Sequence, residues 1–122
     1  MKYALLIYAT PGAADGVQPA DDGVINNWLD YTTALKESGS LLAAEQLAQV
    51  DTATSVTMRA GERLLIDGPF IETKEHLLGF YLIDVPDLDT ALEWAGKMPI
   101  VRYGTVEVRP VLEGQAWRTP LE

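Results

Sequence analysis

One short stretch, residues 66–76 (IDGPFIETKEH), holds the side chains whose types and spacing could do chemistry. Asp67 ends an apolar run and is followed by a glycine-proline turn and by Phe70. A carboxylate that is half-buried against an aromatic ring has a raised pKa and can serve as a general base near neutral pH. Asp67 is therefore the candidate catalytic base. The alternative is that its carboxylate accepts amide hydrogens of the turn and only fixes the local backbone.

Three further polar side chains follow this turn. Glu72 and Lys74 are two residues apart, so in an extended segment they project to the same side, where Lys74 could hold a carboxylate or stabilise a developing oxyanion. The alternative is a solvated charge pair that contributes little. His76 is the single histidine and could shuttle protons near physiological pH, or it could simply be exposed. Asp67, Glu72 and Lys74 are the candidate catalytic residues, and His76 and Phe70 are candidate ligand contacts.

Tyr8 and Arg102 are the candidate ligand contacts outside this stretch. Tyr8 and Tyr81 line apolar runs and could offer a hydroxyl to a ligand, although core packing with the hydroxyl at the rim is the alternative. Arg102 could close a cleft over an acidic ligand. Glu45 stands among leucines and alanines and is expected to face outward. A single histidine and scattered carboxylates give no recognisable spacing of metal ligands, so we expect neither a metal nor a cofactor.

The composition limits the partners and the compartment. A chain of 122 residues that is 48% hydrophobic fits one domain over residues 1–122. Its formal net charge of −9 repels phosphate backbones, so we expect no nucleic-acid partner. The absence of cysteine excludes thiolate chemistry and suits a reducing cytoplasm. Pro11 and Gly12 end the first apolar run early, so we expect neither a signal peptide nor a membrane helix.

A small set of elements must position these residues. Residues 2–9 and 77–85 are apolar on both alternating faces, which predicts two strands at the centre of a sheet. Helical periodicity and an acidic start predict a first helix over residues 22–38, ended by Gly39. A second, short helix is predicted after an Asp87 cap and before Gly96.

The middle of the chain is predicted to be extended. Residues 41–50 are rich in helix formers, but their position after a Ser-Gly-Ser break favours an extended segment. Residues 56–66 alternate around Gly61 and predict a hairpin.

The end of the chain supplies the last strand. Gly79 predicts a close backbone approach or a bulge in the second central strand. Residues 105–111 alternate as a final strand, and Pro110 marks either an edge strand or the end of a strand, because proline has no amide hydrogen. The tail, residues 112–122, is expected at the surface or in an interface, with Trp117 as its anchor.

This order of elements is an α+β, ferredoxin-like split βαβ arrangement with an inserted hairpin. In that topology both helices cover one face of the sheet. The other apolar face then needs cover, and a second subunit is the simplest source, since large apolar patches are rarely left to solvent. We therefore expect a homodimer.

The chain resembles the DGPF-domain branch of the YCII-related superfamily. The resemblance is carried by the opening residues 1–8, the DGPF signature at 67–70, the charged run 72–75, and the segments 79–81, 86–89 and 104–110. It implies a dimeric α+β barrel with a cleft near the signature and a fold similar to that of muconolactone isomerase. It also implies frequent association with extracytoplasmic-function sigma factors.

The resemblance leaves the reaction open. An enzymatic His and Asp pair has been suggested for YCII-like members, but His76 follows Asp67 by nine residues instead of lying on an earlier element. Three hypotheses remain: a small-molecule acid/base enzyme with Asp67 as base and Lys74 as electrostatic partner, a non-catalytic ligand sensor or regulatory module, and a signature needed for folding alone.

Overall fold

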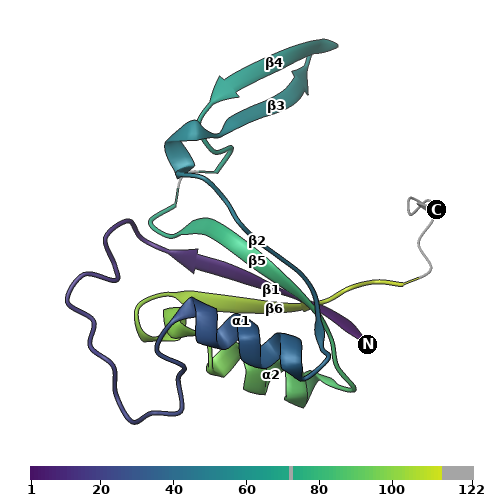
Figure 1. Cartoon of the computed structure of the whole chain (residues 1–122). Helices are drawn as coiled ribbons and strands as arrows, with labels where there is room; N and C mark the ends of the chain where they lie inside the picture. The colour runs from purple at the N-terminus through teal and green to yellow at the C-terminus, as the bar shows by residue number, and fades with distance from the viewer. Residues whose placement is uncertain (72, 114–122) are drawn as a thin grey trace.

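In the computed structural model, which describes residues 1–71 and 73–113, a four-stranded antiparallel sheet carries two helices and a separate hairpin (Figure 1). The elements in chain order are β1 (Lys2–Ala9), α1 (Trp28–Glu37), β2 (Leu41–Gln46), η1 (Val50–Thr52), β3 (Thr54–Arg59), β4 (Glu62–Asp67), β5 (His76–Asp84), α2 (Leu88–Gly96), η2 (Pro99–Arg102) and β6 (Thr105–Pro110). The predicted α+β class is confirmed. Glu72 and the tail anchor Trp117 lie outside the described residues.

The strand order β2-β5-β1-β6 places β1 and β5 at the centre, as their apolar sequences predict. Side chains of β1 alternate strictly, so that Tyr3, Leu5 and Ile7 are buried and the residues between them are half-buried. β6 is an edge strand, which confirms the prediction from Pro110. The extended prediction for residues 41–50 is confirmed over residues 41–46, which form β2, whereas Val50 begins the short helix η1.

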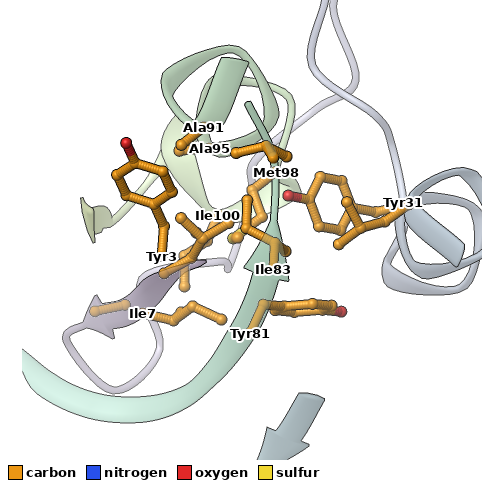
Figure 2. Packing of buried hydrophobic residues seen from close by; sticks show 13 residues of the cluster. Tyr3, Ile7, Tyr31, Tyr81, Ile83, Ala91, Ala95, Met98 and Ile100 are labelled. Carbon is orange, nitrogen blue, oxygen red and sulfur yellow. The ribbon is translucent and has the colours of Figure 1, made fainter. Parts of the chain in front are cut away.

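Both helices lie on the same side of the sheet and enclose the core with it (Figure 1). Figure 2 shows Tyr31 of α1 facing Met98, Ile83 and Tyr81 within the core. The Tyr31 hydroxyl donates a hydrogen bond to the Trp94 carbonyl oxygen at 2.9 Å and so joins the two helices. Burial raises the pKa of Tyr31 well above its ordinary value, and the neighbouring Tyr81 adds to the increase.

The first helix is shorter than its sequence predicts. It begins at Trp28 and not at residue 22, because Asn27 is its N-cap and accepts a hydrogen bond from the Asp30 amide at 2.8 Å. Gly23 has a φ of +81°, a left-handed conformation that interrupts any helix through the preceding residues. Asp22, which we expected at the helix start, instead binds the Arg102 side chain.

Other local predictions are confirmed. Asp87 caps α2 and accepts hydrogen bonds from the Thr90 amide and hydroxyl at 2.9 and 2.7 Å, which lower the pKa of Asp87. Gly39 follows α1 with a φ of +80°. Gly79 does allow a close approach, because a Cβ there would lie 2.6 Å from the Glu45 carbonyl oxygen.

The hairpin of β3 and β4 forms a sheet of its own and extends away from the helices (Figure 1). Ala60 and Gly61 both have positive φ, as a two-residue hairpin turn requires. The turn after Asp67 is held to the base of the hairpin: the Gly68 amide donates to the Ala53 carbonyl at 2.7 Å, and the Ser55 hydroxyl donates to the Gly68 carbonyl at 3.0 Å.

Candidate functional site

A cavity of about 680 Å³ opens between α1, the C-terminal end of β1 and the facing ends of β2 and β5. This volume lies within the range of small-molecule sites, roughly 300–1,000 Å³. We call it the Trp28–Tyr81 pocket. Its described lining is Ile7, Ala9, residues 10–15, Trp28, Thr32, residues 44–46, Leu78, Gly79, Tyr81, Ile100 and Tyr103.

Aromatic rings form the most rigid part of the wall. Trp28 is stacked on Tyr81, with ring centroids 6.0 Å apart and planes 13° apart. Tyr31, which is fully buried, packs edge-on against both rings at 6.2 Å from Trp28 and 5.4 Å from Tyr81. Such aromatic contacts contribute about 0.5–1.5 kcal/mol each beyond their buried area. The lining rings are therefore held in place from behind.

A pair of hydroxyl groups gives this wall its polar point. The Thr32 and Tyr81 oxygens are 2.6 Å apart, and either group can be the donor. Whichever group donates, the other keeps its own hydroxyl hydrogen, and both oxygens retain acceptor capacity. The pair can thus orient a ligand that lies against the rings.

Local sequence explains why these side chains meet. The Asn27 cap fixes the start of α1, so Trp28 and Thr32, four residues apart, lie on one face of the helix. Tyr81 pairs with Leu5 of β1 and Ala44 of β2 in the register of the sheet and is buried beneath that helix face.

The loop of residues 10–15 forms another part of the wall, and Arg102 fixes the chain that continues from this loop. The Arg102 guanidinium donates to both carboxylate oxygens of Asp22 at 3.0 and 3.1 Å, and to the carbonyls of Ala20 and Val24 and the side chain of Asn26. The Arg102 side chain is only 10% exposed. Its hydrogen bonds hold the pKa of Asp22 below the usual range. Arg102 thus ties η2 to the loop that leads into α1.

The catalytic candidates predicted from sequence lie elsewhere. Asp67 is the exposed last residue of β4, Lys74 is exposed, and Phe70 is 64% exposed. The structure brings none of the described three into the lining of the Trp28–Tyr81 pocket. Glu72 is outside the described residues. The catalytic role assigned to Asp67, Glu72 and Lys74 stays a prediction.

The other predicted ligand contacts, Tyr8, His76 and Arg102, also lie outside the described lining of the pocket. His76 and Tyr8 are both half-buried and close together, because His76 pairs with Ala9 and Tyr8 pairs with Leu77 across β1 and β5. Tyr81, weighed from sequence as a hydroxyl donor, is in that lining. Its partners Trp28 and Thr32 were missed, although their four-residue spacing on a helix was a usable signal.

Residues 1–71 and 73–113 were also compared with the requirements of a metal site and of a membrane-spanning helix. No three His, Asp or Glu side chains gather there as a possible metal site. No helix in those residues is long and apolar enough to cross a membrane.

The sheet, its single helical layer and the open pocket define a mixed α+β protein with a concave site. The family model for the YCII-related domain matches residues 1–115. The chain is also 36% identical over 114 residues to "Uncharacterized protein R00369" of Rhizobium meliloti (strain 1021), across 91% of this chain and 92% of that protein. The chain therefore belongs to the YCII-related family, as the sequence motifs indicate. Its assignment to the DGPF branch stays a prediction.

Proposed function

We propose that this YCII-related protein binds a small organic molecule in the Trp28–Tyr81 pocket. The observation that carries the proposal is the pairing of a cavity of about 680 Å³ with a stacked aromatic wall and one hydroxyl pair. Ligand sites are typically concave and mostly apolar, with a few placed polar groups that fix orientation. The pocket has this composition.

The described lining favours binding over acid/base turnover. Its titratable residues are Asp15, Glu45, Tyr81 and Tyr103. The Glu45 side chain lies on the other face of the sheet, with its pairing partner Phe80. The base proposed from sequence, Asp67, is not among the lining residues. We therefore prefer the ligand-sensor hypothesis to the enzyme hypothesis, and any regulatory link to sigma factors would operate through this binding.

A pocket-filling variant tests the proposal against a matched control. Ala44→Leu adds a larger side chain at a half-buried lining position, whereas Ala48→Leu makes the same change at an exposed position outside the described lining. Ligand-observed NMR with a library of small aromatic and aliphatic molecules should identify binders that wild type and Ala48→Leu retain and that Ala44→Leu loses. Equal binding by all three proteins would contradict the proposal. Circular dichroism would confirm that both variants are folded.

We further propose that two such chains pair through the uncovered face of the sheet into a dimer of ferredoxin-like subunits, a dimeric α+β barrel. Residues that pair across β1 and β5 on this face are apolar and only half-buried: Ala4, Leu6, Phe80 and Leu82. Apolar faces at the centre of a sheet are rarely left to solvent. A second copy would cover them.

The hairpin supports the same pairing. Val56 and Leu65 are directly paired across β3 and β4 and are 63% and 57% exposed. Met58, 62% exposed, lies on the same face opposite Arg63. Arg59 and Arg63 stand near the hairpin turn, whereas the whole chain carries a net charge of −9. An isolated two-stranded hairpin is marginally stable in water, so contact with an acidic second copy would stabilise it.

Sedimentation equilibrium tests this pairing. Leu82→Lys places a charge on the uncovered face, and Leu29→Lys makes the same change on α1, where Leu29 is 76% exposed. Wild type and Leu29→Lys should have the mass of a dimer, and Leu82→Lys the mass of a monomer. A monomeric wild type, or a dimeric Leu82→Lys, would contradict this proposal without affecting the proposal of a ligand pocket.

A further inference from the structure

The charged residues in the described lining of the pocket all have one sign. They are Asp15 and Glu45, and that lining includes no Lys, Arg or His. Glu45 pairs with Phe80, so its side chain lies on the uncovered face of the sheet and Asp15 is the carboxylate on the pocket side. Asp15 holds its carboxylate against the loop, since a Cβ placed on Gly12 would lie 3.4 Å from the Asp15 Oδ2 atom. A negative charge is thus built into the loop wall beside the opening.

The cation closest in sequence to the lining does not offset the Asp15 carboxylate. Arg102 immediately precedes the lining residue Tyr103, but its guanidinium is bound to Asp22, to two carbonyl oxygens and to an asparagine. Its charge is therefore paired with the Asp22 carboxylate. With a net charge of −9 on the chain, the field at the pocket repels an anion and attracts a cation.

The neutral groups of the wall favour the same ligand. The Thr32 and Tyr81 oxygens can accept hydrogen bonds from an ammonium group. The half-buried Trp28 ring, stacked on the buried Tyr81, adds aromatic surface to the lining, and such surface attracts both apolar groups and cations. An apolar body with a positively charged end would meet complementary groups at both of its ends.

We propose that the pocket selects a small organic amine, protonated at neutral pH, on an aromatic or aliphatic body. This inference rests on the proposed function of the pocket. It adds a sign of charge and excludes carboxylates and phosphates as the preferred ligands.

Three probes of nearly equal shape test the charge preference. They are 2-phenylethylamine, 2-phenylethanol and 3-phenylpropanoate, which share a phenyl ring and a two-carbon chain and carry positive, zero and negative charge. Titration calorimetry at low salt should give an amine affinity at least about ten-fold higher than that of the carboxylate, and higher salt should reduce the amine affinity.

The outcomes separate the two proposals. Equal or tighter binding of the carboxylate would overturn the amine inference, while binding that is lost in Ala44→Leu would still support the pocket. Binding of the alcohol alone would also overturn the amine inference, and its loss in Ala44→Leu would still support the pocket. If no probe binds, the amine inference is overturned, and the library screen with Ala44→Leu decides the pocket separately.

A charge-removing variant locates the effect. Asp15→Asn should weaken the amine about five-fold and leave the alcohol unchanged, because only the cation loses a partner. Asp21→Asn, an exposed change outside the described lining, is the control and should alter neither affinity. An equal effect of the two variants on the amine would show that net charge alone acts, and would overturn the assignment to the pocket wall.

Discussion

Adding one methyl group at Gly79 should weaken the protein where β2 and β5 meet. A Cβ at this position would lie 2.6 Å from the Glu45 carbonyl oxygen, which is 0.8 Å inside the 3.4 Å at which ordinary contact begins. The same Cβ would lie 3.2 Å from the Gln46 Cα atom. Both neighbours are backbone, so β2 must move as a unit and cannot respond by turning a side chain.

The size of the effect follows from two opposing contributions. Forcing extra volume into a packed interior costs about 1–3 kcal/mol. Replacing glycine by alanine also restricts the unfolded chain, which offsets about 0.5 kcal/mol. The net loss for Gly79→Ala should be about 0.5–2.5 kcal/mol, or about 2–10 °C in Tm for a chain of this length. Because Gly79 and both neighbours line the pocket, probe affinity should fall as well.

Gly96→Ala is the matched control. Gly96 is the last residue of α2, and a Cβ added there would meet no atom within 4 Å outside its own helix and chain neighbours. Alanine there should be neutral or should stabilise by up to about 1 kcal/mol, because glycine is a poor helix former. Urea unfolding of the three proteins at one concentration measures the difference. If Gly79→Ala is as stable as Gly96→Ala, the close approach of β2 to β5 is refuted.

Three further predictions concern the helix start, the core and the loop brace. Asn27→Ala should cost about 1 kcal/mol in urea unfolding, because it removes the N-cap of α1; no loss would contradict that cap. Tyr31→Phe should cost about 1–2 kcal/mol, because the Trp94 carbonyl loses its donor. Since the pKa of Tyr31 is raised, its contribution is complete below the ordinary value of 10.0 and declines above it, so Tyr31→Phe should reduce the loss of stability at alkaline pH. The pKa of Asp22 is lowered by Arg102, so the stability that Asp22 contributes is present above its ordinary value of 3.8 and is lost as the pH falls through the lower folded value. Thermal unfolding between pH 2 and 6 should therefore have a shallower acid slope for Asp22→Asn than for wild type, and identical slopes would count against the brace.

Local patterns predicted most of the fold. Apolar residues on both faces of residues 2–9 and 77–85 predicted the central strands, and Gly79 predicted the close approach beside them. The predicted start of α1 at residue 22 was wrong. Residues 22–27 follow helical periodicity, but their conformation depends on hydrogen bonds to Arg102, which is far along the chain. A contact between residues 80 positions apart leaves no periodic signal in either segment.

The pocket was harder to predict for a related reason. The cluster of charged residues between Asp67 and His76 led to a predicted site there, but the described residues of that stretch lie outside the pocket lining. The wall instead includes Trp28, Thr32 and Tyr81, which are common core residue types and form a site only when α1 packs against β5. The sequence indicated that the Tyr81 hydroxyl could contact a ligand, but it did not indicate that Thr32 is its hydrogen-bond partner.

The most direct test of the pocket is to locate a bound probe by NMR. With isotope-labelled protein and unlabelled 2-phenylethylamine, intermolecular nuclear Overhauser effects should connect the probe to the Trp28 indole and the Tyr81 ring, and should disappear in Ala44→Leu. Effects from a bound probe to Phe70 or His76 instead, with none to Trp28 or Tyr81, would contradict the pocket and favour the site near Asp67.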